Sequence, residues 1–529
     1  MRFFASLFLL LAVSVSAQPG TLDPTFGTDG RLVLRSENGS QNVGANRVLV
    51  RPDGRLVLLG GIGDDAAVIS LTADGARDAS FGKDGVARVS PGAQSEIVFF
   101  GATILADGSL VLAGARQGEF DDTSVALLVK LTASGARDAS FGTNGLVEVG
   151  ATDGSEQSLF LDVRTVSEGG LVAIGAASRA GEEDIETEFV TARFTANGAL
   201  DGSFGDGGIV RAKIRGGLAL FTGTFLSDGS AVLMGGVAPP DGGFFELDAA
   251  LARVLPDGTL DESFGEGGQV VLDMPLPFAA VLDVQADAAG RIVGTGAALD
   301  FLEGVSEALV FRLAPDGSLD ASFADGGVLL TTAGASLAQA TGVALQADGK
   351  IVVSGILGTQ EAPDPLVFRV AEDGAFDPTF GTDGAARVGL GEPALGADVA
   401  LQRDGRIVVV GQLGVDAGSV VGAFAARLQN DGLPISREAG PSRGPLALAL
   451  AGPNPFADRT ALALTLDEAA SVRVSAYDAL GREVAVLHEG PLASGRTVLP
   501  FGGASLAPGV YVVRARAGAS SVAMGVVRR

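Results

Sequence analysis

Residues 22–30 read LDPTFGTDG, and six later stretches of the chain repeat this nonapeptide with small changes. The copies are RDASFGKDG (77–85), RDASFGTNG (137–145), LDGSFGDGG (200–208), LDESFGEGG (260–268), LDASFADGG (319–327) and FDPTFGTDG (376–384). Their phenylalanines lie 59 residues apart on average, and they are Phe26, Phe81, Phe141, Phe204, Phe264, Phe323 and Phe380. Similarity at one period is the signature of a repeat architecture. We therefore expect one large repeat domain.

Each repeat contains four short apolar runs of the kind that form β-strands. In the first unit they are residues 31–34, 47–51, 55–60 and 67–71, with Pro52-Asp53-Gly54 between the middle pair. Glycine tolerates the positive φ of tight hairpin turns, and equivalent turns occur at Asp107-Gly108, Glu168-Gly169, Asp228-Gly229, Asp348-Gly349 and Asp404-Gly405. The fifth copy has Ala289-Gly290 instead. The run IVVVG (407–411) is apolar at consecutive positions, which is typical of a strand covered on both faces.

Four antiparallel strands repeated seven times predict an all-β fold, a seven-bladed β-propeller. Immunoglobulin-like domains need about 100 residues each, which disfavours an array of them. A β-solenoid stays possible, although its coils are usually shorter than this period. The array opens with one strand and closes with three, so residues 31–34 should pair beside residues 423–428 as the outermost strand of the last blade. That arrangement leaves no open sheet edge.

The repeat unit resembles the delta-60 repeat of bacterial secreted proteins. The closest matches are VALQADGKIVVSG (343–355) and VALQRDGRIVVVG (399–411). The resemblance covers residues 22–432, and seven copies agree in order and spacing. It implies a propeller-like domain over residues 18–432 and implies no particular activity.

The first residues have the pattern of an export signal. Met1-Arg2 is positively charged, residues 3–15 are almost entirely apolar, and Val15-Ser16-Ala17 offers small residues. This pattern predicts a signal peptide over residues 1–17, cleaved between Ala17 and Gln18. The alternative is a membrane anchor, but thirteen residues are too few to span about 30 Å of hydrocarbon as a helix. We expect no transmembrane segment in the mature chain.

A module of different character follows the repeats. Residues 433–445, LPISREAGPSRGP, have the composition of a linker. Residues 446–529 hold six acids and eight arginines, a net charge of +2, against −29 for residues 18–445. Strand-like runs cover residues 461–466, 472–477, 484–487, 497–501, 510–515 and 521–527. They predict a small antiparallel β-sandwich.

This module resembles the type A sorting domain that ends the cargo of the type IX secretion system. Three ordered motifs carry the resemblance, and the residues concerned are Pro453, Asn454, Pro455, Phe456, Tyr477, Asp478, Gly481, Arg482, Gly509 and Tyr511. The family often ends in a Lys-containing strand, whereas this chain ends Val527-Arg528-Arg529. The resemblance implies that the type IX machinery and its processing peptidase are partners. It also implies that the protein is secreted or attached to the outer surface of a Gram-negative-type bacterium.

Composition excludes several classes of function. The net charge of −26 opposes binding to nucleic acid. The absence of Cys excludes disulfides, thiol nucleophiles and Cys-ligated metals, and the only histidine is His488. We expect His488 to be a surface or structural residue, and we predict no catalytic, cofactor-binding or metal-binding residues. The acidic clusters Asp121-Asp122 and Glu182-Glu183-Asp184 suit solvated loops, with cation binding as the alternative.

Two classes of function remain open. The first is a propeller with a binding or structural role and no catalysis, whose ligand is an unknown protein or glycan. The second is a glycan hydrolase or lyase that uses paired carboxylates in the central channel. Asp recurs at the second position of the nonapeptide turn in every copy, which favours a structural role for these residues. The variable segments 117–123, 179–188 and 237–246 are where specificity would lie.

Overall fold

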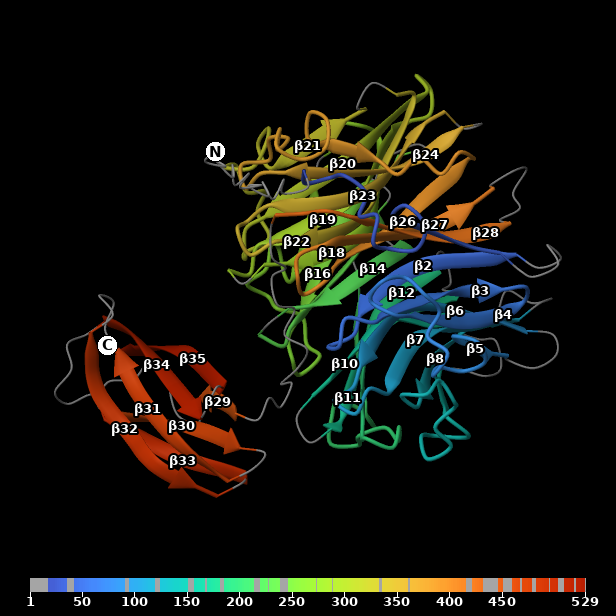
Figure 1. Cartoon of the computed structure of the whole chain (residues 1–529). Helices are drawn as coiled ribbons and strands as arrows, with labels where there is room; N and C mark the ends of the chain where they lie inside the picture. The colour runs from blue at the N-terminus through green and yellow to red at the C-terminus, as the bar shows by residue number, and fades with distance from the viewer. Residues whose placement is uncertain are drawn as a thin grey trace, which may run out of the picture. The chain divides into compact units, whose positions relative to one another are not determined.

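The computed structural model describes residues 18–35, 42–90, 95–118, 124–150, 157–166, 169–180, 185–213, 219–226, 228–237, 246–272, 274–287, 289–332, 335–359, 362–414, 421–431, 446–450, 459–466, 469–477, 482–493, 495–502, 509–517 and 520–528. All regular elements in these residues are β-strands (Figure 1). The chain forms two compact units, Met1–Arg437 and Glu438–Arg529. The predicted signal peptide, the predicted linker and both acidic clusters lie outside the described residues.

The strands described in the first unit form seven four-stranded antiparallel sheets, here called blades 1 to 7. Blade 1 contains β2 (Val43–Val50), β3 (Leu56–Ile62), β4 (Asp65–Leu71) and β5 (Val86–Val89). Blade 2 contains β6 (Ser95–Ile104), β7 (Leu110–Gly118), β8 (Ser124–Leu131) and β9 (Leu146–Val149). Blade 3 contains β10 (Gln157–Thr165), β11 (Leu171–Ala180), β12 (Ile185–Phe194) and β13 (Ile209–Lys213). Blade 4 contains β14 (Ala219–Phe225), β15 (Ala231–Val237), β16 (Asp248–Val254) and β17 (Gln269–Leu272). Blade 5 contains β18 (Phe278–Ala286), β19 (Ile292–Asp300), β20 (Val305–Leu313) and β21 (Val328–Thr331). Blade 6 contains β22 (Leu337–Leu345), β23 (Ile351–Gly358), β24 (Pro363–Val370) and β25 (Ala385–Arg387). Blade 7 contains β26 (Ala394–Leu401), β27 (Ile407–Leu413), β28 (Gly422–Leu428) and β1 (Arg31–Leu34).

Blade 7 is completed by the first strand along the chain. Its strand order is β1-β28-β27-β26, with Leu32 opposite Ala425 and Leu34 opposite Ala423. In Figure 1 the orange strands of blade 7 lie beside the blue β2 of blade 1, and β2 contacts both β26 and β27. The pairing predicted from the out-of-phase repeat ends is therefore confirmed. It covers an edge that would otherwise expose unpaired backbone groups.

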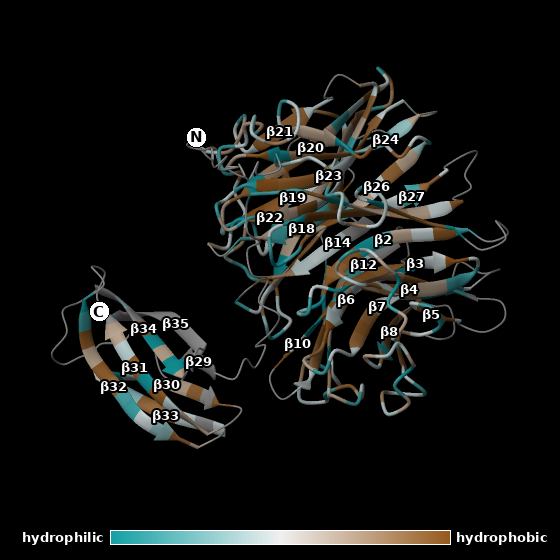
Figure 2. Cartoon of the chain, in the orientation of Figure 1, coloured by the Kyte–Doolittle hydropathy of each residue, from teal (hydrophilic) through white to brown (hydrophobic). Residues whose placement is uncertain are grey.

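Apolar side chains on both faces of each blade join it to its neighbours. In β27, Val408 and Val410 belong to a core shared with blade 1, whereas Ile407 and Val409 belong to a core shared with blade 6. Figure 2 shows the resulting hydrophobic runs along the strands. Because both faces are buried, these strands are apolar at consecutive positions, as the sequence indicates. The seven repeat phenylalanines are also buried, none being more than 6% exposed.

The repeated nonapeptide forms a joint between blades. Asp23 Oδ1 accepts hydrogen bonds from the Thr25 amide (3.0 Å) and hydroxyl (2.7 Å), which folds the peptide into a turn. The Gly27 amide then donates to the Asp74 carbonyl of blade 1 at 2.9 Å. Phe26 packs against Gly75, where a Cβ atom would lie 2.8 Å from the ring. The first copy of the nonapeptide thus connects blade 7 to blade 1.

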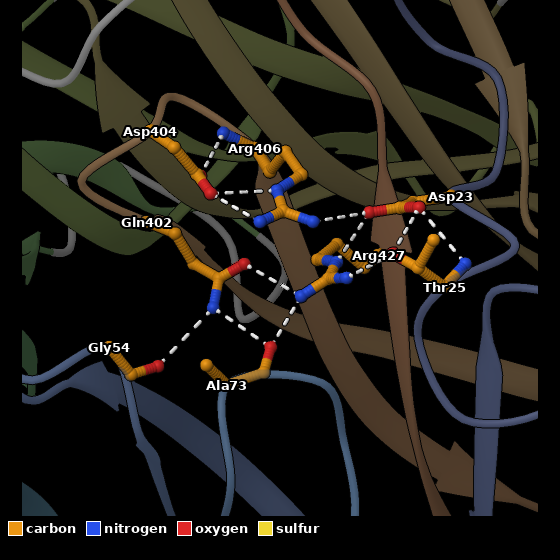
Figure 3. A network of polar contacts seen from close by, with 8 residues as sticks. All are labelled: Asp23, Thr25, Gly54, Ala73, Gln402, Asp404, Arg406 and Arg427. Carbon is orange, nitrogen blue, oxygen red and sulfur yellow. Dashed lines mark hydrogen bonds and ion pairs between the residues drawn. The ribbon is translucent and has the colours of Figure 1, made fainter.

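At the junction of blades 7 and 1, a polar network centred on the buried Asp23–Arg427 pair reinforces the closure (Figure 3). Asp23 Oδ2 accepts from Arg427 Nε and from Arg406 Nη1, each at 2.8 Å. The Arg427 guanidinium also lies 4.9 Å from the centre of the Phe26 ring. Burial alone would raise the pKa of Asp23, but hydrogen bonds from Arg406 and Thr25 and the charge of Arg427 together lower it to about 2. The carboxylate is therefore held in its charged form.

The second unit is a two-sheet sandwich. One sheet contains β29 (Leu446–Leu450), β30 (Arg459–Leu466) and β33 (Gly495–Gly502); the other contains β32 (Glu483–Leu492), β31 (Ala470–Tyr477), β34 (Gly509–Ala517) and β35 (Ser520–Arg528). Both sheets contribute to one core, for example through Leu464, Phe501, Val474 and Val513. The strand β29 is additional to the strands that the sequence predicts.

Candidate functional site

The inner strand of every blade carries an irregularity at the same place. Each pairs with its neighbour through a one-residue shift in register, a β-bulge. The residue after the bulge stands seven positions before the turn glycine in all seven repeats. These equivalent residues are Arg47, Gly101, Asp162, Thr222, Asp283, Gly342 and Asp398. Equivalent positions of a propeller face the same axis, so we call these residues the axial set.

Arg47 connects blades that are not neighbours. Its Nη1 lies 3.0 Å from Asp283 Oδ1 of blade 5 and 3.8 Å from Asp398 Oδ1 of blade 7. Its Nε donates to the Phe100 carbonyl of blade 2 at 3.2 Å. One guanidinium thus contacts three other blades, which places it across the propeller axis.

The two carboxylates also accept hydrogen bonds from the backbone of the following blade. Asp283 Oδ2 accepts from the Val343 amide at 2.9 Å, and Asp398 Oδ2 accepts from the Val48 amide at 2.8 Å. Asp398 Oδ1 accepts from the Val399 amide at 2.8 Å. Both Asp residues are no more than 6% exposed. Buried carboxylates with such partners join neighbouring blades.

The two glycines of the axial set make room for the Asp residue of the next blade. A Cβ atom at Gly342 would lie 3.0 Å from Asp398 Oδ1, and one at Gly101 would lie 2.7 Å from Asp162 Oδ1. A larger side chain at either position would displace the carboxylate. The alternation of small and acidic residues around the axis therefore has a steric cause.

The axial charges perturb one another. Burial raises the pKa of Asp398, Arg47 opposes this rise, and the nearby charge of Asp283 adds to it, so that the pKa stands at about 6. The pKa of Arg47 is raised by Asp283, Asp398 and Asp162, although burial acts in the opposite direction. Burial and the charge of Asp283 therefore favour the protonated form of Asp398.

The axial residues are not among the predicted site residues, although the sequence carries a signal for them. When the repeats are aligned on their turn glycines, this single position reads Arg, Gly, Asp, Thr, Asp, Gly, Asp, while the flanking positions stay mostly apolar. A position that breaks the symmetry of a repeat indicates a specific role.

The predicted sorting-motif residues fall on the second unit as follows. Tyr477 ends β31, Gly509 begins β34, and Tyr511 lies in β34 and is 6% exposed. Tyr477 pairs with Val512, so these three positions share one sheet. Arg482 precedes β32 and is exposed. Pro453, Asn454, Pro455, Phe456, Asp478 and Gly481 lie outside the described residues, as does Ala17.

Two further predicted residues are described. The Gln18 side-chain amide donates to the Gly381 carbonyl at 2.9 Å. His488 lies in β32, and its Nε2 is 3.2 Å from the Gly490 carbonyl oxygen. Within the ranges that the structure describes, no three His, Cys, Asp or Glu residues are grouped so that they could hold a metal ion. Nor does any helix there have the length and apolar character to cross a membrane.

Comparison with protein families gives a match to a β-propeller model described as a domain of unknown function, DUF5122. It matches residues 105–141, 242–264, 289–323 and 346–380, which fall in separate repeats. The chain is a β-propeller repeat protein. A comparison with curated proteins gives no significant match to this propeller protein.

Several solved structures match the chain at low identity and with TM-scores below 0.5. A fungal alcohol oxidase in complex with copper is 13% identical, with a TM-score of 0.36 over 94% of the propeller protein and 98% of the oxidase. A polysaccharide lyase is 13% identical, with a TM-score of 0.40 over 73% and 90%. PorZ, a surface component of the type IX secretion system of Porphyromonas gingivalis, is 12% identical, with a TM-score of 0.24 over 92% and 82%.

Proposed function

We propose that this propeller protein is an exported, non-catalytic binding or structural protein at the bacterial surface or outside the cell. The observation that carries the non-catalytic part is the engagement of the axial carboxylates. Asp283 and Asp398 accept hydrogen bonds from the next blade and contact Arg47. A general acid and base need free access to a substrate, whereas these groups are committed to joining blades.

The test is a screen of the purified full-length protein against glycan and peptide substrates, run beside binding assays on glycan and protein arrays. We expect binding without turnover. Turnover that disappears in both Asp283→Asn and Asp398→Asn, while the variants stay folded, would overturn the proposal.

The second candidate function is a glycan hydrolase or lyase acting through the axial carboxylates. Its supporting observation is the pKa of Asp398, about 6, because a carboxyl group that keeps its proton near neutral pH suits a general acid. This candidate predicts a rate that follows the titration of Asp398 and is lost in Asp398→Asn. A rate independent of pH between 5 and 7 would argue against it.

For export, we propose that residues 446–529 direct the type IX system to carry the protein across the outer membrane. Support comes from the ordered motifs and from the separate core of this unit. Fused behind a signal peptide and a reporter, the segment should carry the reporter to the surface or medium in a host with this system. Removing it should leave the propeller in the periplasm. A truncated chain that still reaches the medium would contradict this role.

A further inference from the structure

A cavity of about 330 Å³ lies at the junction of blades 5 and 6. It is close to the turns that join the first and second strands of these blades. Its volume lies at the lower end of the range of small-molecule sites, about 300 to 1,000 Å³. Its walls carry six charged side chains, and apolar residues add to the lining; these are Asp287, Arg291, Arg312, Asp348, Lys350 and Glu372, with Val293, Leu345 and Ile351.

The equivalent space between blades 7 and 1 is bridged by a side chain. Gln402 stands three residues before its turn glycine, and its Nε2 lies 3.3 Å from the carbonyl oxygens of both Gly54 and Ala73 in blade 1 (Figure 3). Its Oε1 accepts from Arg427 at 3.3 Å. The long carboxamide side chain thus fills this junction.

In blade 5 the same position holds Asp287, which is shorter and bonds within its own turn. Its Oδ1 accepts from the Ala289 and Arg291 amides at 2.9 Å each, and its Oδ2 lies 2.6 Å from Arg291 Nε. Ala289 also replaces the turn acid that is Asp404 in blade 7. Two shorter side chains therefore open the junction that Gln402 closes elsewhere.

The cavity walls carry three cations and three carboxylates, so no net charge selects a charged ligand. Arg291 Nη1 contacts Glu372 Oε1 at 3.1 Å across the two blades. Lys350 Nζ contacts Asp377 at 3.2 Å and Asp348 at 3.6 Å. A carboxylate has about four acceptor sites and an ammonium three donors. Donors and acceptors therefore remain side by side for a ligand.

Gln346 adds a second, independent observation. This residue lines the cavity and is completely buried, yet neither its side-chain nitrogen nor its oxygen has a hydrogen-bond partner within the described residues. A buried carboxamide without partners is costly. A rotation of this side chain into the cavity would bring it to ligand hydroxyl groups, each of which can act as a donor or an acceptor.

We propose that the cavity between blades 5 and 6 binds one neutral, hydroxyl-rich sugar residue, free or at the end of a glycan. This inference rests on the proposed non-catalytic binding function and adds its place and its ligand class. Three features support this proposal: the balanced charges of the cavity walls, their adjacent hydrogen-bond donors and acceptors, and the cavity volume. Binding is non-covalent, and no bond of the sugar changes.

The test uses the full-length protein and isothermal titration with methyl glycosides of glucose, galactose, mannose and N-acetylglucosamine, together with an array of glycans ending in the same sugars. Asp287→Gln should refill the cavity as Gln402 does and weaken binding at least tenfold. Glu372→Ala, at a side chain that is 60% exposed, should weaken it without affecting folding. The matched control is Asp404→Ala, which reproduces Ala289 at the closed junction and should bind like wild type.

The outcomes distinguish a failure of this proposed site from a failure of the proposed binding function. Weaker binding in both variants with an unchanged control supports the site, and binding to the array alone would identify a glycan end rather than a free sugar. If the wild type binds a neutral sugar and both variants bind equally well, the site is wrong while the binding function stands. If only charged sugars or amino acids bind, the ligand class is wrong. Release of cleaved glycan would instead overturn the non-catalytic function itself.

Discussion

At the scale of single residues, two buried carboxyl groups of this propeller have opposite pKa shifts because their neighbours differ. Asp23 is buried among hydrogen-bond donors that lower its pKa to about 2. Asp398 is buried beside another carboxylate, and its pKa is raised to about 6 although Arg47 lies near. The first contributes stability above its ordinary pKa of 3.8, which is lost as the pH falls towards 2. Asp398 instead contributes stability below its ordinary pKa of 3.8, and this stability is lost as the pH rises towards 6.

We expect Asp398 to make the stability of the propeller decline as the pH rises from about 4 to above 6. The folded state holds its proton up to about pH 6, whereas the unfolded chain releases it near 3.8, a difference worth about 3 kcal/mol. Asp398→Asn should remove this decline, whatever its effect on absolute stability. Urea unfolding of wild type and variant between pH 3 and 8 measures it, and parallel profiles would refute the assignment.

A second prediction concerns Arg427→Met. Arg427 and Asp23 side chains are 2% and 1% exposed, and removing one member of such a pair leaves a buried charge that costs about 3 kcal/mol or more. Chemical denaturation should show this loss in the propeller transition. The control is Arg88→Met, whose pair with Asp65 is more exposed and should change stability by less than about 1 kcal/mol. Equal effects of the two variants would contradict the argument.

At the scale of the elements, the axial bulge explains a glycine in the second strand of six blades. A Cβ atom there would lie between 1.9 and 2.3 Å from a carbonyl oxygen of the bulged strand, and the residues are Gly60, Gly114, Gly175, Gly296, Gly355 and Gly411. The final glycine of runs such as IVVVG is therefore required by close approach of two backbones. The same bulge directs the axial set.

Gly411→Ala tests this reading of the strand. The added methyl group would meet the Leu395 carbonyl at 2.0 Å and a Phe424 ring carbon at 2.7 Å, so we expect a loss of about 1–3 kcal/mol in the free energy of unfolding. Gly44→Ala is the matched control, because its nearest atom is 3.8 Å away. If both substitutions change the denaturation midpoint equally, the close approach does not matter.

At the scale of the whole molecule, closure depends on residues 18–34. They provide Asp23, Phe26 and β1, and both Phe26 and Leu34 belong to the core between blades 7 and 1. A chain lacking residues 18–34 should unfold at a clearly lower temperature, because an edge and part of that core are uncovered. A synthetic peptide of residues 18–35 added in trans should raise the midpoint again by mass action. An unchanged midpoint would show that closure lies elsewhere.

Much of this architecture can be predicted from the sequence of each repeat. The Phe-containing turns, the Asp-Gly hairpins and the doubly apolar strands depend on neighbours within one copy or the next, so their pattern predicts the blades and the closing role of residues 31–34. The axial contacts could not be predicted in this way. Arg47 and Asp283 are 236 residues apart and meet only because the ring brings non-adjacent blades to one axis. The cavity likewise depends on whether Gln402 or the shorter Asp287 reaches the next blade, because junction space is set by packing between repeats.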